Sequence, residues 1–485
     1  RMETAQESDL PINGEDHKRG AEGSRLMKPN DRRATTQGPS RLGYWEAYGH
    51  LIRGNLGPGT LNLPYAFARV GWARGMALLV IVSVQGIYSM ATLIRCKRAM
   101  GLPLSSTYMD VGYAAFGRGG RATVQALVSF LQFGVCCVFI QLIATNLAAT
   151  LSGVGGLSST VYTLLVTGVC MVISLLRYIK QLWWLTGLAN VLMITALLSS
   201  TIEAFIQIGR HGGAKNSSGA ASDVFFFLSS MFYAYEGIAI VMPVENGFMR
   251  FEDPSTEHER HRSFLRLLVF AMCTISAIML TLGATCGAAF PDISTGSITA
   301  YLADTNDNPW YKVVNTLTMA AVLMTFPLQL FPAMEVVNDW FGPGCEPRMC
   351  RGESESKQWL PQVDSFEADD ADIVLEDMED NPDMHHPSRG CRIEWALRRL
   401  AAVVVCGAVA LAVNNVALLV SLVGSIGSPG LVMMPSFISL SLHYRSIRIL
   451  PAWTVAADVL VILMSLTVAV AGAYFSISEL VSDLS

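Results

Sequence analysis

Charged side chains are scarce in this sequence of 485 residues. Asp, Glu, Lys and Arg make up only 15% of it, against roughly 25% in soluble globular proteins. With 52% hydrophobic residues, this scarcity excludes an ordinary soluble enzyme. Basic residues are not in excess either, because 34 Lys and Arg stand against 39 Asp and Glu, a net charge of −5. Binding to nucleic acid phosphates needs such an excess, so we expect no nucleic-acid partner.

Cysteines and catalytic motifs are also few. The ten cysteines are scattered and show no CxxC spacing, which argues against a disulfide scaffold or a zinc site. Cys345 and Cys350 lie too far from His385 and His386, at too irregular a spacing, to form a convincing metal site. The sequence also has no P-loop, nucleophile elbow or HExxH helix. We therefore expect no metal, no cofactor and no enzymatic activity.

Long apolar runs are what the sequence has instead. A helix needs about 20 mostly apolar residues to cross a bilayer, and it satisfies its own backbone hydrogen bonds there. Eleven segments qualify, so the sequence predicts an all-α integral membrane protein with eleven transmembrane helices in a lipid bilayer. The predicted spans are residues 43–68, 72–95, 121–151, 158–177, 182–208, 222–247, 263–290, 309–340, 393–413, 415–441 and 451–478.

Two long segments are polar instead. Residues 1–42 carry Gly, Pro, Asn and charges without an apolar period, which predicts a disordered cytosolic tail. Residues 342–390 include an acidic run and predict a long soluble loop on the same side rather than a twelfth span. The first apolar segment lacks the pattern of a removable signal peptide.

The Lys and Arg residues predict the orientation. With the N-terminus inside, 28 of them fall on the cytosolic side of the eleven spans and five on the other side. Because basic loops stay in the cytosol, we expect a cytosolic N-terminus and an extracellular or lumenal C-terminus. The sequon Asn216-Ser217-Ser218 then lies outside or in a lumen, which makes Asn216 a glycosylation candidate.

The first span contains a dense group of helix breakers. Gly54, Gly57, Pro58 and Gly59 follow within six residues, and each costs about 1 kcal/mol (Gly) or 3 kcal/mol (Pro) in a helix interior. The helix should therefore open between Gly54 and Gly59. Amides at the start of the second half-helix would then suit a carboxylate. The alternative is a packing kink on a face of small residues.

The sixth span has a matching feature, because Glu236 and Gly237 lie between aromatic residues near its middle. A charged residue at that depth is costly and usually marks an ion or substrate path. Glu236 could carry a proton, accept a substrate ammonium, or simply cap freed amides. The two interrupted spans are five apart, so they belong to halves of opposite topology, and such paired breaks indicate a transport site near the membrane midplane. The residues alone thus predict a secondary transporter for a small zwitterion or anion.

Both interrupted segments resemble motifs of the amino acid/auxin permease family. The similar runs are Gly54 to Phe67 (GNLGPGTLNLPYAF) and Phe232 to Gly237 (FYAYEG). Further similarity lies in Phe326 to Pro332, in Pro243 to Asn246 and in Leu422 to Ser425. The proton-coupled and vacuolar amino acid transporter branches look nearest, over about residues 40–340 and 393–480.

The resemblance implies a LeuT-like fold, with a 5+5 inverted repeat plus one extra helix. Residues 43–208 would form the first repeat, residues 222–441 the second, and residues 451–478 the extra helix. It also implies alternating access, an amino acid substrate, and a proton as the usual coupling ion, with sodium used elsewhere in the family. By analogy, amides near Gly57 would hold the substrate carboxylate and carbonyls from Tyr233 to Glu236 its ammonium. The substrate-binding candidates are Asn55, Gly57, Gly59, Thr60, Tyr233, Tyr235, Glu236 and Gly237, with Glu236 also the candidate for proton coupling.

Several alternatives stay open. The long polar segments would also suit an amino acid sensor that signals through its cytosolic parts. The membrane could be vacuolar, lysosomal or plasma membrane. Arg53 beside the first break could bind an anion or pair with a carboxylate such as Glu46. The sequence does not show which of Gln132, Thr325, Gln329 and Ser428 point into a pocket.

Overall fold

The computed structural model describes most of the apolar part of the chain. The described residues are 42–103, 105–151, 157–175, 179–213, 219–249, 257–341 and 389–484. The predicted N-terminal tail, nearly all of the predicted acidic loop and the candidate glycosylation site at Asn216 lie outside the described residues. The described part belongs to one compact unit, Arg41–Ser485.

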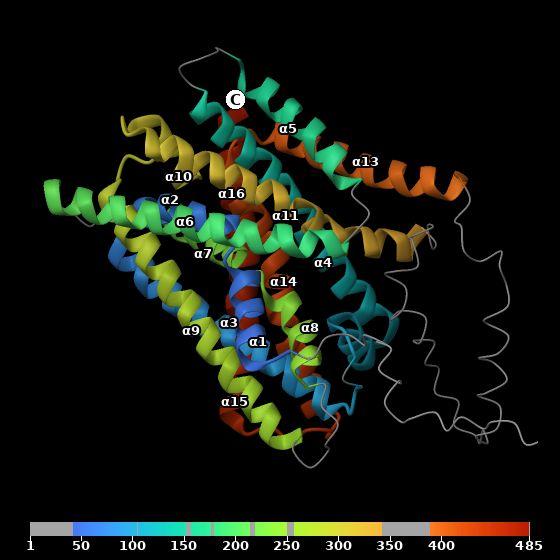
Figure 1. Ribbon diagram of the computed structural model, residues 1–485. Coiled ribbons are helices and arrows are strands. Elements are labelled where there is room, and N and C mark those ends of the chain that lie inside the picture. The colour runs from blue at the N-terminus through green and yellow to red at the C-terminus, as the bar shows by residue number, and fades with distance from the viewer. Residues whose placement is uncertain are drawn as a thin grey trace, which may run out of the picture. The chain divides into compact units, whose positions relative to one another are not determined.

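Every regular element in the described ranges is a helix, which confirms the all-α prediction (Figure 1). The helices are α1 (Tyr44–Asn55), η1 (Pro58–Asn62), α2 (Leu63–Val70), α3 (Trp72–Ala99), α4 (Tyr108–Thr150), α5 (Ser159–Ser174), α6 (Ile179–His211), α7 (Ala221–Ala234), α8 (Ile238–Met249), α9 (Glu257–Ala289), α10 (Ile298–Thr305), α11 (Pro309–Phe341), α13 (Arg389–Ala412), α14 (Val416–Tyr444), α15 (Ala452–Thr467), η6 (Val468–Gly472) and α16 (Ala473–Leu484).

Nine helical stretches in these ranges are long and apolar enough to cross a membrane, so the chain is a multi-pass membrane protein. The two other predicted spans fall short of that criterion for physical reasons. The segment 43–68 is interrupted after Asn55, so neither half reaches 18 residues. The segment 158–177 forms only α5, an apolar helix of 16 residues. By length and apolar composition the structure therefore supports nine of the eleven predicted spans, and one of the nine, Ala221–Phe248, is itself interrupted between α7 and α8.

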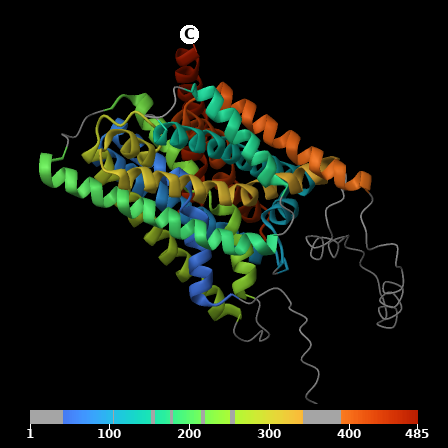
Figure 2. The same cartoon turned by 45° about the horizontal axis from the view of Figure 1, so that its top comes forward.

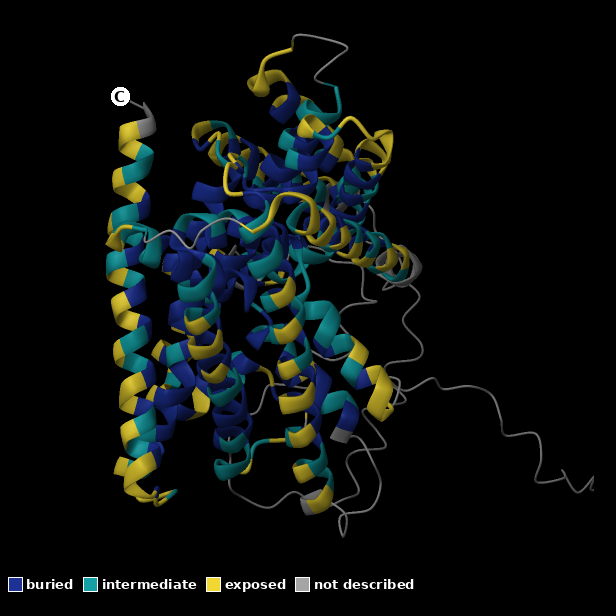
Figure 3. Cartoon of the chain, turned by 90° about the vertical axis from the view of Figure 1, so that its left-hand side faces the viewer, coloured by how far each residue is buried: buried dark blue, intermediate teal, exposed yellow. Residues whose placement is uncertain are grey.

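The helices differ in how much of their surface the protein covers. In their most apolar windows, α14 is 83% buried and α4 is 78% buried, whereas the stretch from α15 to α16 is 28% buried. Figure 3 shows exposed residues along the outer side of that last stretch. Its exposed side chains include Leu460, Leu463 and Leu466. An exposed apolar face of this length is typical of a lipid-facing helix.

The two interrupted helices lie in the centre of this arrangement. The views in Figures 1 and 2 place α1 and α2 next to α7 and α8. Helix α9 packs on α1, α2 and α3, while α14 packs on α4, α7 and α3. Helices α5 and α13 pack against each other on the far side of α4. Both helix breaks are therefore enclosed by protein rather than by lipid.

One stretch predicted as a loop is helical. The sequence predicts the third span to begin at residue 121, yet α4 already begins at Tyr108. Thr107 and Asp110 cap its start reciprocally, since the Thr107 N–H donates to Asp110 and the Asp110 N–H donates to the Thr107 hydroxyl. Gly117 then turns the chain with a φ of 65°, a conformation that favours glycine, before the long apolar part begins.

An ion pair with almost no solvent exposure joins α3 to α8. The Lys97 ammonium lies 3.1 Å from the Glu245 carboxylate, and both side chains are 1% exposed. Lys97 also donates to the Asn246 carboxamide at 2.6 Å, and Arg98 approaches the other Glu245 oxygen at 3.6 Å. A buried pair with extra hydrogen bonds fixes its two helices strongly, because either charge left alone is very costly.

We expect the single substitutions Glu245→Gln and Lys97→Met each to destabilise the protein by about 3–5 kcal/mol, because each leaves a buried charge without its partner. The double variant should recover much of that loss. The measurement is thermal unfolding of the purified protein in detergent, arranged as a double-mutant cycle. Additive losses in the double variant would contradict this reading of the pair.

Candidate functional site

The two helix breaks contact each other directly. A β-carbon built on Gly59 would lie 2.8 Å from the Tyr233 ring and 3.2 Å from the Ala234 backbone. A β-carbon on Gly237 would overlap the Asn55 carboxamide. Glycine at these two positions therefore lets the break after α1 and the break after α7 pack closely. The structure thus brings the two predicted motifs together.

The first break extends from Leu56 to Gly57, between α1 and η1. Thr60 closes the turn that follows, since its N–H and its hydroxyl both donate to the Gly57 carbonyl, at 3.0 and 2.6 Å. Gly57 itself is extended, with open space where a β-carbon would stand. Thr60 therefore shapes the break, whereas Gly57 leaves room beside it.

The second break extends from Tyr235 to Gly237, between α7 and α8. The Tyr235 hydroxyl lies 2.6 Å from Ser83 of α3 and 2.7 Å from Ser276 of α9. These contacts leave only the backbone of Tyr235 for a ligand. Glu236 is partly exposed, but its Oε2 atom is buried and has no hydrogen-bond partner among the described residues.

Several other buried polar atoms at the breaks are also unsatisfied within the described residues. They include Asn55 Oδ1, Asn62 Oδ1 and the Tyr233 hydroxyl. Asn55 uses its Nδ2 to bind the Leu51 carbonyl, and Asn62 uses its Nδ2 to bind Ser230. Buried polar groups are nearly always paired, so a group of unpaired ones indicates a site for water, an ion or a ligand.

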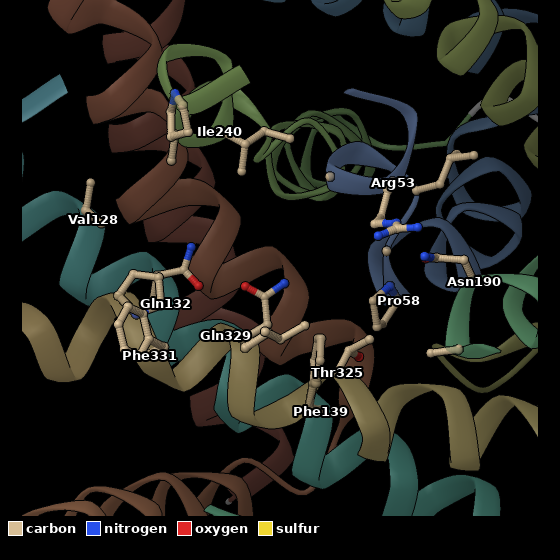
Figure 4. A pocket seen from close by; sticks show the side chains of 18 of the residues that line it. Arg53, Pro58, Val128, Gln132, Phe139, Asn190, Ile240, Thr325, Gln329 and Phe331 are labelled. Atoms are coloured by element: carbon tan, nitrogen blue, oxygen red, sulfur yellow. The ribbon is translucent and has the colours of Figure 1, made fainter. Parts of the chain in front are cut away.

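A cavity of about 450 Å³ adjoins the breaks. It is bounded by α1, α4, α6, α8 and α11, and it reaches the first break at Leu56, Gly57 and Pro58 (Figure 4). Of the eight predicted binding residues, Gly57 alone is among its lining residues. The cavity is within the 300–1,000 Å³ range of small-molecule sites. Its polar lining residues are Arg53, Thr107, Tyr108, Gln132, Asn190, Thr325, Gln329 and Glu335.

The cavity settles which of four open candidates point inward. Gln132, Thr325 and Gln329 line it, whereas Ser428 does not. The sequence contains no signal that separates these residues, because each is one polar side chain within an apolar helix. Arg53 also lines the cavity, half-buried, and makes no ion pair or hydrogen bond within the described part of the chain. Glu46 instead caps its own helix through the Gly43 N–H.

The other halves of the broken helices are tied together. Arg69 of α2 lies 2.8 Å from Asp223 of α7 and 2.8 Å from Glu479 of α16. Its guanidinium also lies over the Phe226 ring, 4.4 Å from the ring centre. The α2 and α7 halves are thus held closed by charge, while the α1 and α8 halves border the cavity.

Comparison with known proteins gives one family and several relatives. The family model described as transmembrane amino acid transporter protein matches residues 40–478. Vacuolar amino acid transporter 3 of Saccharomyces cerevisiae is 25% identical over 60% of this chain, which spans only 41% of that protein's length. Amino acid transporter AVT3C of Arabidopsis thaliana is 27% identical, covering 64% of this chain and 73% of the relative. Its relative AVT3A is 25% identical over 88% of each chain.

The chain also has matches among solved structures. An inward facing conformation of Mhp1 is 12% identical over 91% of each chain, with a TM-score of 0.48. A Na⁺-coupled sialic acid symporter in its outward-open state is 14% identical over 90% of each chain, with a TM-score of 0.45.

Because the two breaks contact each other, alanine substitutions at Gly59 and at Gly57 should have different effects on stability. We expect Gly59→Ala to destabilise the protein by about 1–3 kcal/mol, because its methyl group would push into Tyr233 and Ala234. Gly57→Ala should leave the melting temperature unchanged, because no atom lies within 4 Å of its added methyl group. The measurement is thermal unfolding of the two variants side by side. Equal melting temperatures would show that the breaks do not pack as described.

Proposed function

The chain belongs to the transmembrane amino acid transporter family, and from that premise we propose that it is a secondary transporter that carries amino acids by proton symport. The observation that supports this most strongly is the meeting of two interrupted helices beside a cavity with unpaired polar groups. Interrupted helices in paired positions are the usual binding elements of secondary transporters. A bound amino acid would supply hydrogen-bond partners for the polar groups that the protein leaves unpaired.

The proposed topology has eleven spans. It adds the interrupted segment from α1 to α2, and the short α5, to the nine stretches that are long and apolar enough to cross a membrane. The two interruptions would then lie in equivalent places of a LeuT-like 5+5 inverted repeat, with the last span outside the repeat. The distribution of Lys and Arg supports a cytosolic N-terminus. The yeast relative is named a vacuolar amino acid transporter, which supports a vacuolar membrane as the location of this protein.

The substrate would bind as a zwitterion across the two breaks. Its carboxylate would lie at the first break, where Gly57 leaves open space and Arg53 supplies a half-buried cation. Its ammonium would donate hydrogen bonds to the carbonyl groups between Tyr233 and Glu236. A guanidinium in a site with little water binds a carboxylate well, because charge-assisted hydrogen bonds are the strong ones.

Alternating access would use the two halves of each broken helix. The α2 and α7 halves are closed by the Arg69 ion pairs, and the α1 and α8 halves line the cavity. With the N-terminus in the cytosol, the cavity faces the cytosol and the ion pairs close the other side. Opening that other side would require the Arg69 contacts to separate.

Glu236 is the proposed proton carrier. A carboxylate with a buried, unpaired oxygen is costly in a membrane, and protonation of Glu236 would remove its charge. Protonated Glu236 would therefore favour the occluded, substrate-bound state, and release of the proton would favour the open one. Sodium coupling is the competing mechanism, and it would use the same unpaired oxygen atoms as ligands.

We expect proteoliposomes containing the purified protein to accumulate radiolabelled amino acids under a pH gradient. A sodium gradient alone should produce no accumulation. Glu236→Gln should abolish the pH dependence of uptake while binding remains, because the amide mimics the protonated acid and cannot titrate. The measurement is initial uptake rate as a function of pH, with binding followed by thermal shift.

Glu394→Gln is the matched control, since this exposed glutamate of α13 pairs with Arg398 on the helix surface and lies outside the cavity lining. Its pH profile should equal that of the unmodified protein. An unchanged profile in Glu236→Gln would remove Glu236 from the coupling step. Accumulation driven by sodium alone would refute proton symport.

A further inference from the structure

Two glutamine side chains face each other across one part of the cavity. Gln132 comes from α4 and Gln329 from α11, and their carboxamides point toward one another (Figure 4). Gln132 is 7% exposed, and its Oε1 atom is buried without a partner among the described residues. Gln329 is half-buried and likewise makes no hydrogen bond within the described part of the chain. The pair is thus a polar spot that the protein itself leaves unsatisfied.

An unsatisfied carboxamide in this position has a physical cost. A buried polar group without a partner loses its hydrogen bonds to water and gains none in return, and apolar side chains of similar size would avoid that cost. Apolar lining residues, among them Val128 and Phe331, lie near Gln132, and the polar Thr325 is four residues before Gln329 on α11 (Figure 4). Two carboxamides placed together in such surroundings are therefore suited to a polar ligand group that enters between them.

The charged groups of the cavity restrict what that ligand group is. Arg53 lies at the opposite side of the cavity from the two glutamines (Figure 4). It is the one cation among the described lining residues, and Glu335 is the one carboxylate. If Arg53 holds the substrate's α-carboxylate, as in the proposed function, the amino acid side chain extends toward neutral amides. A second carboxylate there would meet no second cation.

We propose that Gln132 and Gln329 form the side-chain subsite of this transporter and select amino acids with a carboxamide side chain, such as glutamine. This inference rests on the proposed function. Each glutamine offers one acceptor and an NH₂ donor, so the pair can both donate to and accept from a substrate carboxamide. Sites built to hydrogen-bond a substrate group reject analogues that lack it, because their own polar groups then stay unpaired.

The test compares three substrates of similar length in proteoliposomes: L-glutamine, L-glutamate and L-methionine. For the unmodified protein we expect kcat/KM for glutamine to exceed the values for the other two by about 10-fold or more. Gln132→Met and Gln329→Met should each lower the glutamine value by about 10-fold. Methionine uptake should stay the same or rise, because an apolar side chain then meets apolar walls.

Two further variants separate this subsite from other effects. Gln207→Met on α6 lies outside the cavity lining and should leave the glutamine-to-methionine ratio unchanged. Arg53→Gln should lower uptake of glutamine and methionine alike, since it acts on the carboxylate that both share. Melting temperatures of all variants show whether each is folded.

The possible outcomes are distinct. Equal uptake of glutamine and methionine by the unmodified protein, or better uptake of glutamate, would overturn the subsite. The subsite would also be overturned if Arg53→Gln lost its selectivity for glutamine while Gln132→Met and Gln329→Met kept theirs. Failure of the unmodified protein to bind or accumulate any amino acid would instead refute the proposed function, which this inference requires.

Discussion

Backbone groups freed inside a membrane must find partners in protein or in an enclosed cavity, and this structure is organised around two places where that happens. Helix α1 stops at Asn55 and α7 stops at Ala234, and glycines let the two ends pack on each other. The Thr60 N–H and hydroxyl bind the Gly57 carbonyl, which ties off part of the first break locally. Asn62, which donates to Ser230, links the second half of the first broken helix to α7. The most buried helices, α4 and α14, then enclose this centre, and the less buried ones face outward.

Two separate groups of ion pairs connect the broken helices to their neighbours. Arg69 joins α2 to α7 and α16, whereas Lys97 joins α3 to α8. The first contact is partly exposed, with side chains between 18% and 31% accessible, and the second is almost completely buried. Exposed ion pairs contribute little to stability and are screened by salt, while buried ones break only at high cost. The Arg69 contacts are therefore easier to separate than the contact that attaches α8 to α3 through Lys97.

Features that depend on local chemistry could be predicted from the sequence. The first break follows from the density of glycine and proline, the second from Glu236 beside Gly237, and the nine long apolar stretches follow from apolar length. What depends on packing could not be predicted. The start of α4 at Tyr108 depends on a cap and on the positive φ of Gly117. Which of Gln132, Gln329 and Ser428 lines a cavity depends on the rotation of each helix, because every position in a largely apolar helix carries a similar signal.

The same difference explains why the predicted binding residues and the cavity overlap only at Gly57. Motif residues such as Gly59, Thr60 and Gly237 form the two breaks through their backbone conformation and close contacts. The Thr60 hydroxyl and the space beside the two glycines are therefore already used within the protein. Residues that discriminate between substrates must instead keep their polar atoms free. Arg53 and Gln132 both line the cavity, and the buried, unpaired Oε1 of Gln132 costs folding free energy that a bound ligand or water would recover. The glycine-rich motifs thus identify where the helices are interrupted, and the unsatisfied polar atoms beside the interruptions indicate the chemistry of the ligand that would bind there.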